Sequence, residues 1–323
     1  MIRLFCGFAT LVALALSAAP AAGQDYPVKP IKIVVASAAG GASDILSRLV
    51  AEKMQQALGQ PVVVEARPGA NGNIAAEYVA AAPPDGYTLM MGTIGALAIN
   101  ASLYKSVRYD PLKDFAPVAR LVSFSNLLVV KASLPVNNVK ELIAYAKERP
   151  GKLSFGSPGA GGSPHMAMVQ FAQMADIDLV HAPYKGAAPA LTDLMGGYID
   201  LAFSDPLLTQ PQLESKRIRA LAVSGSKRLP SLPDVPTVAE AGVPGYAVSG
   251  WLGIAAPART PPAIVNKLNA TLNEIMKQPD MVAKMREQGA EIITTTPEEF
   301  GRFMAAEYVR WKQVIARGKL AAD

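Results

Sequence analysis

The sequence has almost no cysteine: Cys6 is the only one among 323 residues. It lies in an N-terminal apolar stretch that is typical of a removable leader, so the mature protein is expected to contain no thiol. Disulfides, cysteine nucleophiles, iron–sulfur clusters and thiolate zinc sites are therefore excluded. Histidine is nearly as scarce. His165 and His181 stand at no spacing that forms a metal site with each other or with carboxylates on one helix face, so no metal is expected.

The motifs of the common enzyme folds are missing as well. There is no G-x-S-x-G sequence, no G-x-G-x-x-G after the first strand and no G-x-x-x-x-G-K-[ST] loop, so the α/β-hydrolase, dinucleotide-binding and P-loop patterns are all absent. We expect no cofactor. Charged residues make up 18% of the chain, and the net charge of +5 is spread among acidic residues without a basic cluster. Nucleic acid is therefore not an expected partner.

The N-terminus resembles a secretory signal peptide. Arg3 precedes an uncharged apolar run from Leu4 to Leu16, and small residues follow up to Gly23. We expect residues 1–23 to be removed, and a buried N-terminal helix is the weaker alternative. The run is shorter than the roughly 20 apolar residues that span a bilayer, and no later run reaches that length. Cys6 lies at the start of the run rather than after it, where a lipid-modified cysteine would have to be, which disfavours a lipid anchor.

Half of the residues are hydrophobic, and their pattern alternates between strand and helix. The β-branched run Ile31–Val35 is followed by a glycine-rich break and by a helical period that extends to Leu58. The same order then repeats, and such alternation favours an α/β fold with mostly parallel, doubly covered sheets. The further elements expected in this series are a strand at Val62–Glu65, a helix at Ile74–Ala82 and a strand at Tyr87–Met91.

A second strand and helix series begins after a long apolar stretch at Phe115–Val130. Asn138 and Glu141 form a capping-box-like helix start, and Thr296 and Glu299 form another near the C-terminus. Two series predict two lobes. We expect one lobe to comprise residues 24–126 and 249–323, and the other residues 127–248. The elements expected in the second series are helices at Val139–Glu148, His165–Met174 and Ala187–Met195, and strands at Ser154–Ser157, Leu179–Ala182, Asp200–Phe203 and Arg219–Ser224.

Three loops rich in Gly, Ser and Asn lead from strands into helices. Glycine lets the backbone approach a ligand closely, and the unpaired N–H groups of a helix N-terminus favour an anion. One such loop alone is more simply a tight turn, but three in one chain favour anion binding, and a carboxylate fits them well. The loop residues are Gly40, Gly41, Ala42 and Ser43; Ala70, Asn71, Gly72 and Asn73; and Ser157, Gly159, Ala160, Gly161, Gly162 and Ser163.

Several side chains near strand ends have two possible roles. Asp44 is either a ligand contact or a first-turn acid that pairs with Arg48 one turn later. Tyr184 either contacts a ligand or belongs to a solvated turn. Asp205 follows a strand, where α/β sheets bind ligands, but it could equally cap the next helix. For His181, hydrogen bonding to the backbone is favoured over catalysis.

The order of short motifs resembles the Bug-type extracytoplasmic solute receptors of tripartite tricarboxylate transporters, over nearly the whole mature chain. Each motif is weak alone, but the ordered set is specific. It comprises Tyr26–Val35, Ala38-Ala39-Gly40-Gly41 with Asp44, Arg67-Pro68-Gly69 with Gly72-Asn73-Ile74, Pro84-Asp85-Gly86-Tyr87-Thr88-Leu89, Tyr109-Asp110-Pro111, Asp114-Phe115, Gly156-Ser157, His165, Pro183-Tyr184-Lys185-Gly186, Leu191-Thr192-Asp193-Leu194, Asp234-Val235-Pro236-Thr237 and Trp251-Leu252-Gly253.

The resemblance implies a two-lobed type II periplasmic-binding fold (a Venus flytrap). Such a periplasmic receptor is not an enzyme. It closes on a small carboxylate and delivers it to membrane permease subunits, whereas a secreted enzyme acting on a carboxylated substrate is the alternative. The resemblance places the ligand at the loops Ala38–Asp44 and Ser157–His165. Ser37, Ala66 and Val169 depart from the family pattern, and Ser37 removes an aromatic wall. The expected ligand-binding residues are Ser37, Ala39, Gly40, Gly41, Asp44, Ser157, Gly159, Ala160, Gly161, Gly162, Ser163, His165, Tyr184 and Asp205.

Overall fold

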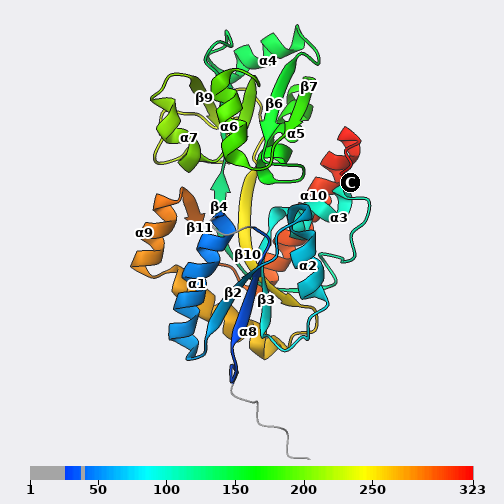
Figure 1. Cartoon of the computed structure of the whole chain (residues 1–323), viewed down its shortest axis with the longest axis vertical. Coiled ribbons are helices and arrows are strands. Elements are labelled where there is room, and N and C mark those ends of the chain that lie inside the picture. Colours follow the sequence, from blue (N-terminus) through cyan, green and yellow to red (C-terminus); the bar gives the residue numbers. More distant parts are fainter. Residues whose placement is uncertain (1–25, 38–40, 323) are drawn as a thin grey trace, which may run out of the picture.

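The computed structural model describes residues 26–37 and 41–322. The expected leader at residues 1–23, with Cys6, lies outside the described residues. The chain forms two lobes stacked along the long axis of the molecule, each built around one sheet with helices on its faces (Figure 1). Within the described ranges, no helix is long and apolar enough to cross a membrane.

The first lobe contains a mixed six-stranded sheet in the order β11-β4-β10-β3-β1-β2. Strand β1 pairs in parallel with β2 and β3, whereas β10 runs antiparallel to β3 and β4. The central strands are mostly apolar and buried because helices cover both faces of the sheet. The strands are β1 (Ile31–Val35), β2 (Val62–Ala66), β3 (Thr88–Thr93), β4 (Phe115–Ser125), β10 (Ser249–Pro257) and β11 (Ala290–Ile292).

The helices of this lobe begin and end at recognisable signals. The first begins after Gly41 and ends at Gly59, whose left-handed backbone suits glycine. The last begins at Thr296, which forms the expected capping box with Glu299. The helices are α1 (Ala42–Leu58), η1 (Ala70–Gly72), α2 (Asn73–Ala80), η2 (Gly95–Ile99), α3 (Asn100–Leu103), α8 (Pro262–Met276), α9 (Pro279–Glu287) and α10 (Pro297–Gly318).

The second lobe contains a five-stranded sheet in the order β7-β6-β8-β5-β9. Strand β6 is parallel to β7 and β8, and β5 is antiparallel to β8 and β9. The expected cap Asn138 accepts a hydrogen bond from the Glu141 N–H. The elements are β5 (Leu127–Lys131), α4 (Val139–Lys147), β6 (Leu153–Ser157), α5 (Ser163–Ala175), β7 (Leu179–Pro183), α6 (Ala187–Gly196), β8 (Leu201–Ser204), α7 (Pro206–Leu213) and β9 (Ile218–Val223).

The chain crosses between the two sheets at two neighbouring points. The apolar stretch Phe115–Val130 forms two strands in different sheets, β4 and β5, with Asn126 between them. The return crossing precedes β10. Ser224, which is fully buried, joins the crossings: its Oγ accepts from the Asn126 N–H (2.8 Å) and donates to the Val248 carbonyl (2.7 Å). One hydroxyl therefore holds both crossing segments together.

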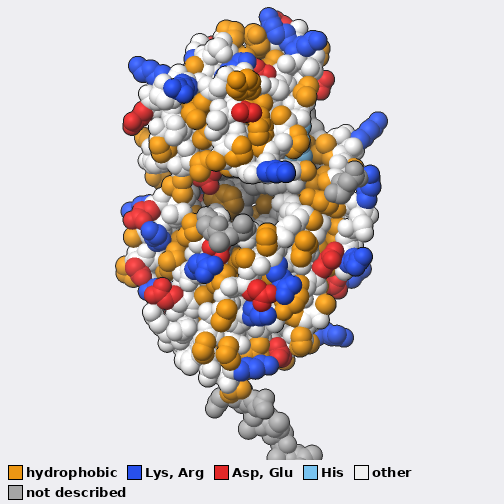
Figure 2. All heavy atoms as spheres, viewed as in Figure 1, with side chains coloured by type: hydrophobic (Ala, Val, Ile, Leu, Met, Phe, Trp, Pro, Cys, Tyr) orange, Lys and Arg blue, Asp and Glu red, His pale blue; other side chains and the backbone are white. Residues whose placement is uncertain are grey.

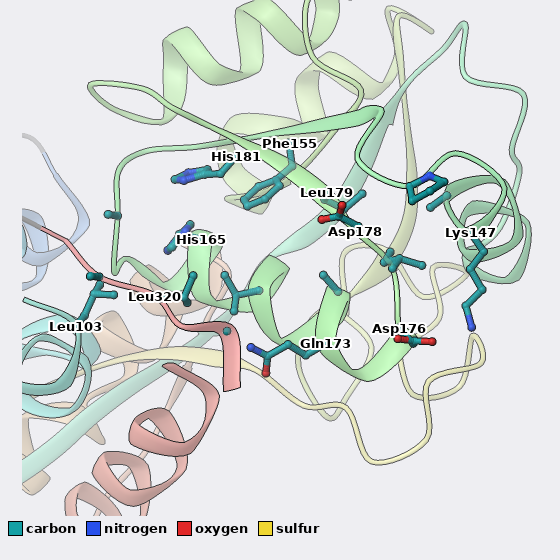
Figure 3. A pocket seen from close by; sticks show the side chains of 18 residues that line it. Leu103, Lys147, Phe155, His165, Gln173, Asp176, Asp178, Leu179, His181 and Leu320 are labelled. Carbon is teal, nitrogen blue, oxygen red and sulfur yellow. The ribbon is translucent and has the colours of Figure 1, made fainter. Parts of the chain in front are cut away.

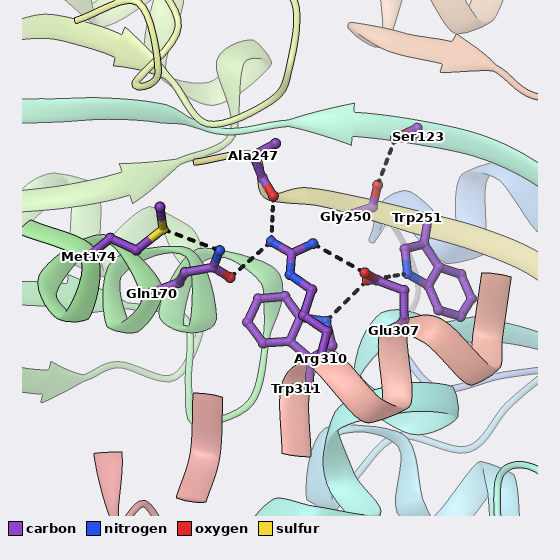
Figure 4. Close-up of polar contacts among 9 residues, drawn as sticks. All are labelled: Ser123, Gln170, Met174, Ala247, Gly250, Trp251, Glu307, Arg310 and Trp311. Atoms are coloured by element: carbon purple, nitrogen blue, oxygen red, sulfur yellow. Dashed lines mark hydrogen bonds and ion pairs between the residues drawn. The ribbon is translucent and has the colours of Figure 1, made fainter. Parts of the chain in front are cut away.

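Helix α10 packs against the first lobe and also reaches the second (Figure 4). Glu307, which is only 7% exposed, accepts hydrogen bonds from the indole N–H groups of Trp251 (3.3 Å) and Trp311 (3.1 Å). Its other oxygen lies 3.2 Å from Arg310 Nη1. Arg310 Nη2 donates to Gln170 Oε1 on α5 (2.9 Å) and to the carbonyl of Ala247. The carboxylate therefore orients the arginine that joins the two lobes.

We expect Glu307→Ala to be strongly destabilising, because it leaves two buried indole N–H groups and a half-buried guanidinium without their acceptor. The free energy of unfolding should fall by about 3 kcal/mol. This value is at the lower end of the range for breaking a buried ion pair, because Arg310 is partly exposed to solvent. Urea denaturation measures it. Glu298→Ala, at an exposed position on the same helix, is the control and costs under about 1 kcal/mol. Equal losses for the two variants would contradict this role of Glu307.

Candidate functional site

The first-lobe loop is described only in part, because Ala39 and Gly40 lie outside the described residues. On either side of them, the hydroxyls of Ser37 and Ser43 are 2.7 Å apart and share a hydrogen bond. Asp44 is 2% exposed, and Arg48 Nε donates to both of its oxygens (3.1 and 3.0 Å). The expected Asp44–Arg48 pair is thus confirmed. Gly41 has φ −74°, so its backbone does not require glycine.

The loop before α2 holds itself together through asparagine side chains. Asn71 Nδ2 donates to Asn100 Oδ1 (2.9 Å), while Asn100 Nδ2 donates to Asn73 Oδ1 (2.7 Å) and to the Asn71 carbonyl (3.0 Å). The Tyr109 hydroxyl also lies 3.0 Å from Asn73 Oδ1. These partners place Asn71 and Asn73 in a fixed internal network.

Two histidines hold the glycine-rich loop of the second lobe. Ser157 is fully buried at the end of β6, and its Oγ lies 2.7 Å from His181 Nε2 and 3.1 Å from the Gly159 carbonyl. The Gly161 N–H donates to His165 Nδ1 (3.2 Å). His181 therefore bonds to a side chain rather than to the backbone expected from the sequence, and the Gly161 N–H is already engaged.

The loop keeps other donors available. The N–H groups of Ala160, Gly162, Ser163 and His165 have no hydrogen-bond partner within the described part of the chain. The last three lie at the N-terminus of α5, where the helix dipole favours negative charge. The Ser163 hydroxyl accepts from Asn126 Nδ2 (3.0 Å). Asn126 therefore connects this helix start to the crossing between the lobes.

The imidazoles stack beside the loop. The His165 and His181 ring centroids are 4.2 Å apart, and those of His181 and Phe155 are 4.7 Å apart. Burial, with a smaller repulsion from His181, lowers the pKa of His165 to about 3, and burial also lowers the pKa of His181. Both rings are therefore neutral at neutral pH. They line one end of a cavity of about 760 Å³ between α5, β7 and the C-terminal residues Leu320 and Ala321 (Figure 3).

A smaller cavity of about 150 Å³ lies on the side of the glycine-rich loop marked by Pro158 and Pro164. It is also lined by residues at the C-terminal end of β8, at the start of α6 and at the crossing between the lobes. Figure 2 shows the molecule hollowed between the lobes, with hydrophobic side chains at the floor of the hollow. The residues are Phe124, Asn126, Gly156, Pro158, Pro164, Ala187, Ala190, Leu191, Ala202, Phe203, Ser204 and Asp205.

Asp205 and Tyr184 both have partners on neighbouring helices. Asp205 Oδ1 accepts from the Leu207 N–H (2.8 Å), so Asp205 is the N-cap of α7 as well as part of the small cavity. Burial raises the pKa of this carboxyl above its usual range. The Tyr184 hydroxyl donates to Asp193 Oδ2 (2.7 Å). Partial burial together with this hydrogen bond raises the pKa of Tyr184 to about 12.

The lobes touch at Gly161. A Cβ at this position would lie 2.7 Å from Asn71 Nδ2 and 2.8 Å from Leu103 Cδ2, both in the first lobe. Its φ of +80° independently requires glycine. The glycine-rich loop of one lobe is therefore seated on the asparagine network of the other.

The sequence patterns did not identify Phe124, Asn126 or Asn100. Asn126 could have been noticed as a polar residue inside the apolar stretch Phe115–Val130, whereas the partners of Asn100 follow only from the fold. Among the described residues there is no group of three or more His, Cys, Asp or Glu side chains that could hold a metal ion.

Solved proteins with this architecture are also similar to this chain in sequence. Rpa4515 of R. palustris, solved with adipate, is 40% identical with a TM-score of 0.82, over 92% of this chain and 99% of that one. MatC from Rhodopseudomonas palustris, solved with malate, is 33% identical with a TM-score of 0.78, over 90% and 100%. These likenesses confirm the expected two-lobed periplasmic-binding fold.

Further relatives and a family model indicate the same family of receptors. Protein BugT of Bordetella pertussis is 35% identical over 316 residues, which are 98% of this chain and 97% of the relative. The periplasmic binding protein BugD is 35% identical with a TM-score of 0.79, over 92% of this chain and 100% of that one. The model of the tripartite tricarboxylate transporter family receptors matches residues 46–320. The chain therefore belongs to the tripartite tricarboxylate transporter family receptors.

Proposed function

We propose that this chain is a periplasmic receptor that binds a small carboxylate between its lobes and delivers it to the membrane permease subunits of a tripartite tricarboxylate transporter. The observation that carries the proposal is the start of α5, where Gly162, Ser163 and His165 present N–H groups without partners. The adipate and malate held by two relatives support a carboxylate as the ligand class. The family, together with the leader expected at residues 1–23, supports a periplasmic location.

Backbone N–H donors alone can supply the affinity that carboxylate binding requires. A hydrogen bond to a charged group contributes about 1.5–3 kcal/mol, so a few of them approach the roughly 8 kcal/mol of micromolar binding. Ala160 adds a further N–H, and the first-lobe loop Ala38–Asp44 is proposed to complete the site from the other side. The side chains of His165 and Ser157 serve a positioning role, because they bond to the loop and to His181 rather than to the ligand.

Binding is proposed to close the lobes, which comprise residues 24–126 with 249–323 and residues 127–248. Both hinge segments are short, and Ser224 joins them. We propose that the seating of Gly161 against Asn71 and Leu103 belongs to the closed arrangement. A ligand that bonds to donors of both lobes binds the closed arrangement more tightly than the open one, and it therefore stabilises the closed arrangement.

Catalysis is not part of the proposed function, although Ser157 and His181 lie at the distance of a nucleophile and its base. Ser157 is fully buried, so no substrate carbonyl can reach its oxygen. Within the described chain, His181 has no carboxylate partner to orient its ring, as a hydrolytic triad requires. The pair acts as a structural contact that holds the loop.

Native mass spectrometry of the protein purified without denaturation should identify a co-purifying carboxylate by its mass. Adding that compound at 100 times its dissociation constant should stabilise the folded state by about 2.7 kcal/mol, seen as a higher melting temperature. The compound should be recovered chemically unchanged. Its conversion into a product would contradict the receptor function.

Gly161→Ala should strongly weaken ligand binding in calorimetry, because the new methyl group displaces Leu103 and Asn71, whose hydrogen bonds with Asn100 resist the shift, and so opposes closure. Gly197→Ala is the matched control: its φ of +81° imposes the same backbone strain of about 1 kcal/mol, but no atom lies within 4 Å of the new Cβ. The control should bind normally.

Arg48→Gln and Lys185→Gln should weaken binding far less than Gly161→Ala. If either charge variant fails to bind while Gly161→Ala binds normally, a side-chain salt bridge holds the anion instead of the backbone.

The folded state should lose stability as the pH falls below about 6.5. The unfolded chain protonates His165 near that pH, whereas the folded chain does so only near pH 3, so the unfolded state binds more protons between these values. The loss for this residue approaches about 1.4 kcal/mol per pH unit. Chemical denaturation at pH 7.5 and pH 5 measures it.

His165→Asn keeps an acceptor for Gly161 and should show a shallower pH dependence than the unaltered protein. Parallel curves for the two proteins would rule out His165 as the source.

A further inference from the structure

We propose that the ligand of this receptor is a compact carboxylate whose apolar body ends in a hydrogen-bond donor, an ammonium or a hydroxyl group, and that Asp205 selects it. This inference rests on the proposed function and names the ligand class for the same site. It follows from the size, the lining and the charge of the small cavity beside the glycine-rich loop.

The size of the cavity limits the body of the ligand. Its volume of about 150 Å³ matches an apolar protein cavity that holds one benzene ring. Aromatic, proline and aliphatic side chains form most of its wall, so it favours a single ring or a short alkyl chain over a polyhydroxylated or multiply charged body. The apolar wall consists of Phe124, Pro158, Pro164, Ala187, Ala190, Leu191, Ala202 and Phe203.

The position of the cavity links it to the carboxylate site. Pro158 and Pro164 line it and bracket the glycine-rich loop, and Pro164 lies in the first turn of α5. Gly162 and Ser163 do not themselves line the cavity, but they lie between these two prolines in the sequence, so a carboxylate on their N–H groups is inferred to lie beside it. The rest of the molecule then extends into it, toward the end of β8.

The polar groups of the cavity all have oxygen acceptors. They are Asn126, Ser204 and Asp205, and no lysine or arginine lines the cavity or pairs with Asp205 in the described part of the chain. Asn126 is 2% exposed; its Nδ2 donates to Ser163, and its Oδ1 has no partner among the described residues. Ser204 can also donate through its hydroxyl, but the Asp205 carboxylate and Asn126 Oδ1 only accept, and acceptors that lose water on binding require a donor. A second ligand carboxylate would instead meet Asp205 as a like charge.

Asp205 also caps α7, and the test must separate that role from the selection of the ligand. Asparagine caps helices as well as aspartate does, so Asp205→Asn keeps the cap on the Leu207 N–H and removes only the charge. Glu214→Gln removes one charge from an exposed residue at the other end of α7 and is the matched control.

Calorimetry with two matched ligand series tests the inference. One series is benzoate, 4-hydroxybenzoate, 4-(aminomethyl)benzoate and terephthalate, and the other is hexanoate, 6-aminohexanoate and adipate. In at least one series the donor-ended member should bind about tenfold or more tightly than the dicarboxylate, as expected for one hydrogen bond to a charged group. Asp205→Asn should reduce that ratio about tenfold, whereas Glu214→Gln should leave it unchanged.

Tighter binding of the dicarboxylate by the unaltered protein, or the same ligand ranking in Asp205→Asn, would overturn the inference but leave the receptor function intact. The second result would show that Asp205 is a helix cap only. If no carboxylate of either series, nor malate, binds to the unaltered protein, the carboxylate-binding function itself fails and the inference fails with it.

Discussion

The fully buried hydroxyl of Ser224 joins the two segments that cross between the lobes, next to the proposed binding site. It accepts from the backbone of Asn126 in one crossing segment and donates to the Val248 carbonyl in the other. The side chain of Asn126 then donates to Ser163 at the start of α5. The two crossing segments and the proposed ligand donors thus share one buried hydrogen-bond chain, in which a lost partner is costly because water cannot replace it. In the proposed closure, this chain would couple the angle between the lobes to the start of α5.

The glycine-rich loop before α5 is the proposed binding loop. Its path is fixed by side chains, while several of its N–H donors have no partner among the described residues. His165 Nδ1 accepts from the Gly161 N–H and His181 Nε2 bonds to Ser157 Oγ, at the cost of burying the His165 imidazole, whose pKa burial lowers to about 3. Arg310 on α10 also holds α5 in place, because its guanidinium donates to Gln170 on that helix. Preorganised backbone donors lose little entropy when an anion arrives, which is how neutral groups can hold a carboxylate without an arginine.

Local patterns predicted the parts of the fold that depend on neighbouring residues. The capping box of Thr296 and Glu299, the Asn138 cap, the Asp44–Arg48 pair and the strand at Ile31–Val35 all follow from spacings of a few residues. The resemblance correctly gave the family and the fold. Contacts between distant segments could not be read in this way: Asn126 with Ser224, and Gly161 with Asn71, meet only through the tertiary arrangement. Likewise, the hydrogen bond from the Gly161 N–H to His165 and the extended backbone of Gly41 could not be predicted from the sequence.

The central claim is that the N–H groups at the start of α5 bind the carboxylate, and amide NMR tests it most directly. In a ¹⁵N–¹H titration with a bound carboxylate, the resonances of Gly162, Ser163 and His165 should shift downfield as their protons gain a charged acceptor. The Gly161 resonance should change less, since its proton is already donated to His165. If the three amides stay unperturbed while the ligand saturates the protein, the anion binds elsewhere and the account is wrong.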